Sequence, residues 1–185
     1  MPPYRALLAD GGYVASFAAG FTVDRLADVV GTPSIVRIMP NLPSEIGRGV
    51  SGIYARPELV AEHRRSIETL MALAGSVVWV DSEAALDRVT AIAGSGPGYV
   101  FEIARCFVEA AKALGFSETE ARDLVLETMA GTLEMARQSP ESLETLRNNV
   151  TSKNGTTQAG LERFHQNERL ASLFEEVTQA AYKRA

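Results

Sequence analysis

Two loops combine glycine, hydroxyl side chains and a helical pattern that follows them. The first reads AGSGPGYVF (93–101), where three glycines free the backbone for close approach to a ligand and Pro97 suits a first helical turn. The second reads TSKNGTTQAGL (151–161). A helix N-terminus with unpaired N–H groups and adjacent hydroxyls favours an anion such as a carboxylate or phosphate. The second loop is therefore a candidate for a small anion site.

Both loops also have ordinary structural explanations that involve no ligand. An ordinary N-cap followed by a turn is the more common meaning of a loop such as 151–157. The segment GSGPG differs from the dinucleotide fingerprint G-x-G-x-x-G, which should in any case follow a strand. The spacing of residues does not indicate a Ser–His–Asp arrangement. It does not indicate a catalytic pair of carboxylates either, since the acidic residues mostly occupy polar helix faces.

The cysteine and histidine content offers little further chemistry. The single cysteine, Cys106, lies in the apolar helical run 99–114, where we expect a small buried hydrophobe rather than a nucleophile. One cysteine cannot form an intramolecular disulfide, which agrees with a reducing compartment. His63 and His165 lie in polar stretches with no second ligand at metal spacing. We expect both rings to be solvated and no metal to be bound.

Composition limits the class of protein. The 185 residues, 46% hydrophobic and 22% charged, can bury a core as one domain or two small ones. The net charge of −5 comes from 23 acidic and 18 basic residues spread along the chain, which argues against a nucleic-acid partner. The sequence contains neither an apolar run of membrane-spanning length nor a secretory pattern at its start. We expect a cytoplasmic protein without a membrane partner.

The elements that must position these loops fall into two parts. Residues 1–81 alternate strand and helix patterns, with strands expected at 13–17, 34–39 and 77–80 and helices at 22–30 and 58–75, the latter closed by Gly75. This spacing predicts βαβ crossovers and a mostly parallel sheet. The fold class expected here is α/β, with a partial Rossmann-like parallel sheet.

Residues 82–185 read as helix throughout. A helix over 83–92 is followed by the first glycine loop and by a long helix to Leu114 that is apolar nearly all round, so we expect burial on several sides. Ser117 and Glu120 predict a capping box for a helix to about residue 138. Ser139, with Pro140 in the first turn, predicts the next helix, and a last helix begins after Asn167.

The stretches 86–116 and 146–164, with SFAAG (16–20) and RIMPNLPSEIGRGVSGIYA (37–55) upstream, resemble pyrroline-5-carboxylate reductase in content and order. The resemblance covers nearly the whole chain, and its VTS..GTT segment is specific to that family. It implies reduction of the imine 1-pyrroline-5-carboxylate to L-proline by NADPH or NADH in proline biosynthesis. It also implies that residues 82–185 are an all-helical substrate-binding and dimerisation domain, and that two subunits share the site.

The resemblance assigns roles to individual residues. It implies that Thr90 hydrogen-bonds the imine nitrogen and delivers a proton, although a helical threonine that bonds its own backbone remains an alternative. The carboxylate anchor maps to the second loop, at Ser152, Asn154, Gly155, Thr156 and Thr157. The residues near the cofactor are Ala18, Ala19, Gly20, Met39, Pro40, Asn41, Ser95, Gly96 and Pro97.

Departures from the family pattern leave alternatives open. Lys153 and Asn154 stand where the family usually has Pro-Gly, Ala93 stands where serine is common, and Pro140 falls near a frequent acidic position. The glycine-rich βαβ unit of the family does not occur in the sequence, so we expect an amino-terminally shortened reductase, either a fragment of a longer protein or a shortened gene product. A catalytically silent dimerisation module is the alternative. A different imine or β-hydroxyacid reductase is disfavoured by VTS..GTT.

Overall fold

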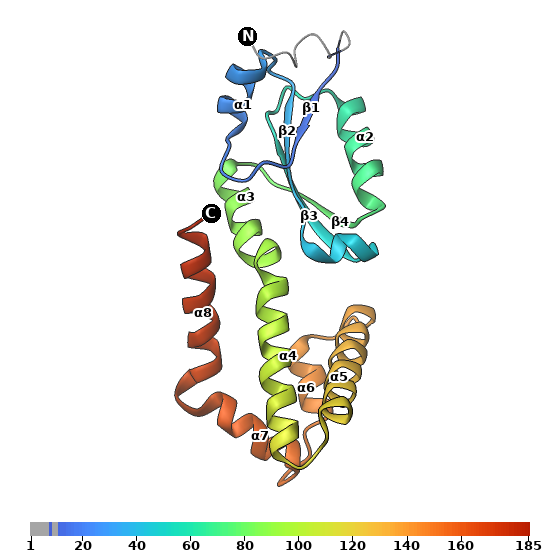
Figure 1. The fold of residues 1–185 in the computed structure, drawn as a ribbon, viewed down its shortest axis with the longest axis vertical. Helices are drawn as coiled ribbons and strands as arrows, with labels where there is room; N and C mark the ends of the chain where they lie inside the picture. Colours follow the sequence, from blue (N-terminus) through green and yellow to red (C-terminus); the bar gives the residue numbers. More distant parts are fainter. Residues whose placement is uncertain (1–7, 9–10) are drawn as a thin grey trace. The chain divides into compact units, whose positions relative to one another are not determined.

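The computed structural model describes residue 8 and residues 11–185, which belong to two compact units. The first unit comprises the residues up to Gly98 together with Thr178–Ala185, and the second comprises Tyr99–Val177. The first contains a four-stranded sheet with helices and the second is helical, so the predicted succession of an α/β part and an all-helical part is confirmed (Figure 1). The predicted domain limits, 1–81 and 82–185, stay predictions.

The sheet has the order β1-β2-β3-β4, with β1 at Val14–Ser16, β2 at Ile35–Met39, β3 at Gly49–Ala55 and β4 at Gly75–Trp79. β1 with β2 and β3 with β4 are parallel, joined through α1 (Val23–Val30) and α2 (Ala61–Ala72), whereas β2 and β3 are antiparallel. The mostly parallel sheet is confirmed. Strand β3 was missed, because its sequence GVSGIYA contains two glycines and a serine, which weaken a strand pattern.

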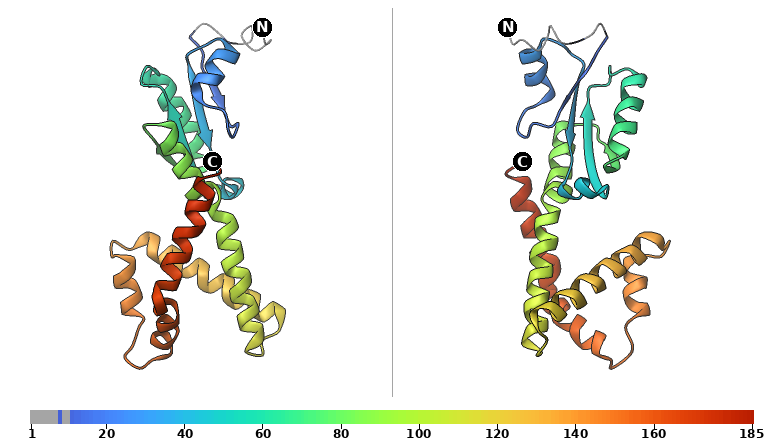
Figure 2. Two further views of the ribbon diagram at one scale, coloured as in Figure 1. Left: turned by 90° about the vertical axis from the view of Figure 1, so that its left-hand side faces the viewer. Right: turned by 45° about the vertical axis from the view of Figure 1, so that its right-hand side comes forward.

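One face of the sheet holds the main hydrophobic core. Val36 and Ile38 of β2 and Ile53 of β3 are fully buried against Ile67 of α2, with Ala55 and Met71 beside them. Side chains alternate along a strand, so residues 35, 37 and 52 face the other way. Figures 1 and 2 show α1 and α2 on opposite sides of the sheet.

The other face of the sheet receives α3 (Glu83–Val89) at unusually close range. A Cβ added to Gly52 would lie 2.8 Å from Val89 Cγ1 and 3.0 Å from Leu86 Cδ1. Glycine at this position of β3 therefore sets the distance between the sheet and the helix that carries Thr90 at its end.

The predicted helix over 58–75 is longer than the one observed. α2 ends at Ala72, and Gly75 is the first residue of β4 rather than the terminator of the helix. Gly75 has a φ of 137°, and a Cβ there would lie 2.1 Å from the Gly49 carbonyl oxygen. Close strand pairing and a positive φ explain this glycine, not helix capping.

The helical elements that follow are α4 (Gly96–Ala113), α5 (Glu118–Gln138), α6 (Leu143–Asn149), α7 (Thr156–His165), a short 3₁₀ turn η4 (Gln166–Glu168) and α8 (Arg169–Tyr182). The capping box of Ser117 and Glu120 is confirmed at the start of α5. The cap predicted at Ser139 is wrong. Ser139 ends α5, and Ser142 caps α6 by accepting a hydrogen bond from the Thr145 amide at 3.1 Å.

The helical unit buries few side chains. Ala111, Ala121 and Val125 form its buried cluster, with Val108 and Met129 packed against them. The expected burial of the long helix is wrong for the single chain, because Phe101 is 62% and Phe107 49% exposed. Cys106 is exposed too, so its expected role as a buried hydrophobe is also wrong. No helix within the described residues is long and apolar enough to span a membrane.

Candidate functional site

Thr90 begins a π-helical turn between α3 and α4. The predicted helix over 83–92 is α-helical only to Val89, and Thr90–Gly94 continues it with the wider π spacing. The Ser95 amide closes the turn by donating to the Thr90 carbonyl at 3.0 Å. Single π turns inside helices are rare and are frequent at functional sites. Sequence reasoning missed this feature because TAIAG has no signal that separates a π turn from an α-helix.

The hydroxyl of Thr90 is committed to its own helix. Thr90 Oγ1 donates to the Leu86 carbonyl oxygen at 2.9 Å, and the side chain is half-buried. This is the backbone bond that the sequence analysis kept as an alternative. A hydroxyl oxygen whose proton is engaged still has lone pairs, so in this arrangement it can accept from an N–H group but cannot donate to one.

Asn41 joins the sheet to the π turn. Its Nδ2 donates to the Ala93 carbonyl oxygen at 3.0 Å, and its Oδ1 accepts from the Val50 amide at 2.8 Å. Asn41 also occupies the N-cap position of the 3₁₀ turn η2 (Leu42–Ile46), yet its side chain does not cap that turn. The side chain therefore connects strand β3 with the segment that carries Thr90.

The residues predicted to line the cofactor crevice lie at the carboxyl ends of two parallel strands. Ala18, Ala19 and Gly20 follow β1 and are exposed, while Met39 ends β2, Pro40 follows it, and both are half-buried. Gly20 has a φ of 72°, and a Cβ there would meet nothing within 4 Å among the described atoms. Small side chains beside a parallel strand end allow a flat ring to approach the backbone, which fits one end of a dinucleotide.

The first glycine loop forms the start of α4. Ser95 ends the π turn, and Gly96 and Pro97 are the first two residues of α4, as the pattern of a proline in the first turn predicted. The Gly98 amide donates to the Ser95 carbonyl at 3.0 Å. Ser95, Gly96 and Pro97 thus belong to the same unit as Thr90 and Asn41.

The second loop is a tight turn before α7. Asn154 has a left-handed φ of 61°, which explains why asparagine serves where the resembled family usually has glycine, because these residues tolerate that conformation best. A Cβ on Gly155 would lie 2.3 Å from Ser152 Oγ and 3.1 Å from the Ser152 carbonyl oxygen, so a larger residue there would displace the Ser152 hydroxyl. The Gly155 amide donates to the Ser152 carbonyl at 3.0 Å.

The turn presents an open helix end. Gly155 is the N-cap of α7, and no side chain of the described residues caps this helix. The first-turn residues Thr156 and Thr157 are exposed, as is Ser152. These three hydroxyl residues therefore lie at a helix N-terminus, and the uncapped amides of such an end favour an anion. These predicted substrate residues all lie in the helical unit.

A buried ion pair escaped the sequence analysis. Arg37 in β2 is 5% exposed and pairs with Glu83 at the start of α3. Glu83 also accepts from the Val23 amide at 2.6 Å, and Arg37 Nε has no partner among the described residues. Arg37 and Glu83 thus hold α1, β2 and α3 together. The two residues are far apart in sequence, so no local pattern could have paired them.

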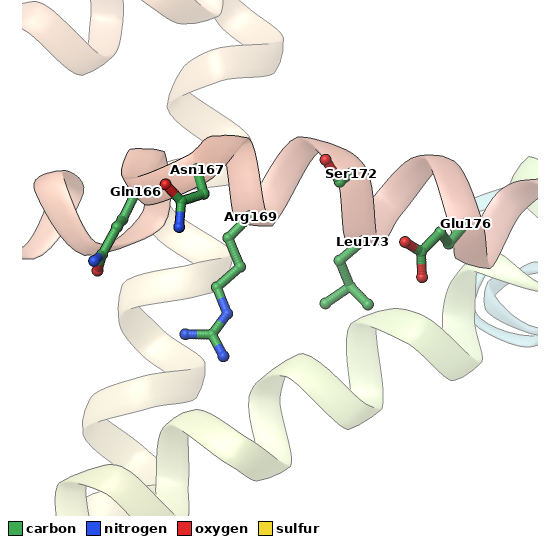
Figure 3. A pocket seen from close by; sticks show the side chains of 6 residues that line it. All are labelled: Gln166, Asn167, Arg169, Ser172, Leu173 and Glu176. Carbon is green, nitrogen blue, oxygen red and sulfur yellow. The ribbon is translucent and has the colours of Figure 1, made fainter.

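A cavity of about 730 Å³ lies where α7 turns into α8 (Figure 3). Two consecutive non-glycine residues with left-handed backbones, Asn167 and Glu168, make the turn. None of the predicted site residues lines this cavity, whose lining is Gln166, Asn167, Arg169, Ser172, Leu173 and Glu176.

Comparison with known proteins identifies relatives along the whole chain. A family model described as pyrroline-5-carboxylate reductase dimerisation matches residues 83–185. The chain is 40% identical over 186 aligned positions to the pyrroline-5-carboxylate reductase of Vibrio alginolyticus, covering 99% of this chain and 68% of that protein. It is 37% identical to the enzyme of the same name from Pseudomonas aeruginosa, covering 93% of this chain and 63% of that protein.

Solved structures agree with these relatives. The chain matches a pyrroline-5-carboxylate reductase from Coxiella burnetii with a TM-score of 0.91 and 34% identity, over 97% of this chain and 67% of that one. It matches the pyrroline carboxylate reductase of Plasmodium falciparum, solved with NADP bound, with a TM-score of 0.84 and 26% identity, over 95% and 70%. The chain spans about two thirds of the length of such relatives.

Proposed function

The chain belongs to the pyrroline-5-carboxylate reductase family, and we propose on that ground that the protein reduces the cyclic imine 1-pyrroline-5-carboxylate to L-proline with a nicotinamide cofactor. The observation that carries the proposal is the 40% identity to a pyrroline-5-carboxylate reductase over 99% of the chain. The chain spans only 68% and 63% of the length of the two bacterial relatives. That it has the activity of a whole reductase is therefore proposed here, along with the reaction itself.

The proposed anchor for the substrate carboxylate is the turn before α7. The first amides of α7 and the hydroxyls of Ser152, Thr156 and Thr157 surround an open helix N-terminus, and Asn154 and Gly155 give the turn its shape. A carboxylate there gains charge-assisted hydrogen bonds and the positive end of the helix dipole. Lys153 adds a positive charge to the same loop, and this charge also attracts an anion.

The proposed contact with the imine nitrogen is Thr90. The imine must be protonated before it accepts hydride readily, and its N–H then becomes a hydrogen-bond donor. Because Thr90 Oγ1 already donates to Leu86, its free lone pairs suit that donor. We therefore assign Thr90 the task of orienting and stabilising the protonated imine, in place of the proton delivery that the resemblance implied.

The residues that would hold the nicotinamide end of the cofactor are those at the ends of β1 and β2 and at the start of α4. They comprise Ala18, Ala19, Gly20, Met39, Pro40, Ser95, Gly96 and Pro97. Bound there, NADPH or NADH supplies the hydride. NADP is the form bound to the Plasmodium falciparum structure, and the proposal covers both forms for this protein.

Homodimerisation through the helical unit is part of the same proposal, supported by the dimerisation family model over residues 83–185 and by the exposed apolar side chains of α4. The cytoplasmic location stays a prediction. The silent-module alternative gains no support from the comparisons, because the relatives that match along the chain bear the name of the reductase.

The experiment that tests the carboxylate anchor compares proline with pyrrolidine, which lacks the carboxylate, as inhibitors of imine reduction. Wild-type protein should prefer proline. Thr157→Ala should raise the KM for the imine and weaken inhibition by proline roughly 10- to 100-fold, since a hydrogen bond to a charged group is worth about 1.5–3 kcal/mol. Inhibition by pyrrolidine should not change. Absence of imine reduction by wild-type protein with either cofactor would overturn the proposed function.

Thr90 has a matched control in the same unit. Thr69 Oγ1 donates to the Arg65 carbonyl at 2.9 Å, the same backbone bond that Thr90 makes, but on an exposed helix away from the predicted site residues. Thr90→Val should lower kcat more than it changes the KM, whereas Thr69→Val should leave both unchanged. Equal kcat for the two variants would remove Thr90 from the mechanism.

A further inference from the structure

We propose that Asn41 is a positioning residue that fixes the π turn carrying Thr90, and that it does not act as a cofactor ligand. The proposal rests on the proposed function, because it assigns Asn41 a task in aligning the imine with the nicotinamide. It departs from the sequence analysis, which placed Asn41 among the residues that line the cofactor crevice. Four observations carry it.

The first observation is that both ends of the Asn41 amide are engaged. The Val50 amide is a donor and must face Oδ1, at 2.8 Å, while the Ala93 carbonyl is an acceptor and must face Nδ2, at 3.0 Å. The chemistry of the two partners thus sets the orientation of the amide group. A freely rotating side chain, as a simple ligand in an open crevice would be, does not fit this arrangement.

The second observation concerns the carbonyl of Ala93. In an α-helix this oxygen would accept from the amide four residues on, which is residue 97. Residue 97 is proline and has no N–H. The Gly98 amide, which the π spacing of five residues would offer, donates to the Ser95 carbonyl instead. The helix therefore does not supply that donor. The Nδ2 group of Asn41 supplies a donor in its place. Asn41 therefore completes a turn that Pro97 leaves one hydrogen bond short.

The third observation concerns the sheet. The antiparallel register pairs Met39 of β2 with Gly52 of β3, and two further steps would place residue 41 opposite Val50. β2 ends at Met39, so backbone pairing does not reach this point. Asn41 Oδ1 accepts from the Val50 amide instead. The Asn41 side chain thus adds one hydrogen bond beyond the end of the backbone pairing between β2 and β3, and it links this end of the sheet to the π turn.

The fourth observation is the place of this link in the chain. Asn41 lies two residues after Met39, the last residue of β2, in the proposed cofactor crevice, and the π turn that it holds begins with Thr90. Hydride transfer needs the reacting atoms about 3–3.5 Å apart, and displacement by about 1 Å can cost about 100-fold in rate. One side chain that joins the cofactor strand to the imine-binding turn can set that distance.

A double-mutant cycle tests whether Asn41 acts through Thr90. Asn41→Ala should lower kcat roughly 10- to 100-fold, with little change in the KM for the cofactor. Combined with Thr90→Val it should lower kcat little further, because both changes disable the same contact. A raised KM for the cofactor would identify Asn41 as a direct ligand, and kcat effects that multiply in the double variant would show that Asn41 does not act through Thr90. Either result would overturn the proposal.

The variant Asn41→Asp separates the two hydrogen bonds. Its carboxylate can still accept from the Val50 amide, but when ionised it cannot donate to the Ala93 carbonyl. Protonation restores a donor. The kcat of Asn41→Asp relative to wild-type protein should therefore rise as the pH falls, a response that a purely structural loss would not produce. A pH-independent ratio would contradict the role of the Ala93 bond.

Hydrogen exchange tests the structural claim without any need for activity. The Ser95 amide, which closes the π turn, should exchange at least tenfold faster in Asn41→Ala than in wild-type protein, while the amides of α2 should not change. Asn149→Ala is the matched control, since it removes an exposed asparagine that donates to Glu141 at 3.2 Å. Unchanged exchange at Ser95 would overturn the proposal even if no reductase activity is found.

Discussion

The two units of this chain solve the problem of apolar burial differently. The α/β unit buries Ile38, Ile53 and Ile67 completely between its sheet and α2. The helical unit buries mainly alanines. Ile46 and Leu73 of the α/β unit are more than 60% exposed, but the helical unit leaves a larger set of big apolar side chains this exposed: Phe101, Leu114, Leu133, Met135, Leu143 and Val150. Apolar exposure on this scale is unusual for a surface that faces only water.

The difference shows where each unit finds its stability. Side chains of the α/β unit contribute within the chain, so their removal should cost the same at any protein concentration. The exposed apolar side chains of the helical unit can contribute burial only when a further surface covers them, so their effect should depend on concentration.

Ile53→Ala should lower the free energy of unfolding by about 3 kcal/mol, because it leaves a cavity in the fully buried core against α2. Urea unfolding at two protein concentrations measures the loss, which should be the same at both. Leu73→Ala, at a residue that is 79% exposed, is the control and should cost less than about 0.5 kcal/mol. Similar losses for the two variants would contradict the assigned core.

Gly52→Ala should cost about 2 kcal/mol, because the new methyl group would lie 2.8 Å from Val89 Cγ1 and must push α3 away from the sheet. Thermal unfolding measures the cost. The control is Gly131→Ala in the middle of α5, where the added Cβ meets no described atom within 4 Å. That change should stabilise by about 0.5–1 kcal/mol, since alanine favours the helix over glycine.

Phe101→Ala should weaken self-association at least tenfold, because its ring is 62% exposed in the single chain on a helix with other exposed apolar side chains. Sedimentation equilibrium measures the dissociation constant, with Leu73→Ala as the control. If the chain stayed monomeric at high concentration, the proposed dimer would be wrong. The exposed apolar side chains of the helical unit would then gain no burial from self-association.

Ser117→Ala should cost about 1 kcal/mol by removing the N-cap of α5. The effect should depend on pH. Hydrogen bonds from the Ser117 hydroxyl and then from its backbone amide hold the pKa of Glu120 below its usual value. The hydrogen bonds between Ser117 and the ionised Glu120 therefore stabilise the fold fully above the ordinary glutamate pKa range, roughly pH 4–5. Their contribution to stability is lost as the pH falls through the lowered pKa of Glu120.

Urea unfolding of wild-type protein and Ser117→Ala between pH 7 and pH 3 measures this dependence. The difference between the two free energies of unfolding should shrink toward the acid end. A difference that grows on acidification would show that the carboxylate of Glu120 does not take part in the cap.

Features set by neighbouring residues could be predicted from the sequence. The capping box of Ser117 and Glu120 spans one turn, and the helix expected at 22–30 is observed as α1. Patterns failed where distant residues decide the local structure. Gly49 and Gly52 obscured β3 because their role is to admit Ser44, Leu86 and Val89 from elsewhere in the chain.

The candidate site divides along the same line. The turn before α7 is local, and its glycine, asparagine and hydroxyls pointed to an anion from the sequence alone. The link from Asn41 to Ala93 and the pair of Arg37 with Glu83 join residues far apart in sequence, so no spacing rule could find them. The π turn had no signal in its own residues, TAIAG, that separates it from an α-helix.

Pro97 and Asn41 should also be coupled in evolution. Any other residue at position 97 brings a backbone N–H that can bond the Ala93 carbonyl, and the amide of Asn41 then loses that task. Conversely, a chain without a donor at position 41 leaves the carbonyl beside Pro97 unsatisfied. Among homologous sequences we therefore expect the two positions to covary, with proline at 97 retained where asparagine is retained at 41.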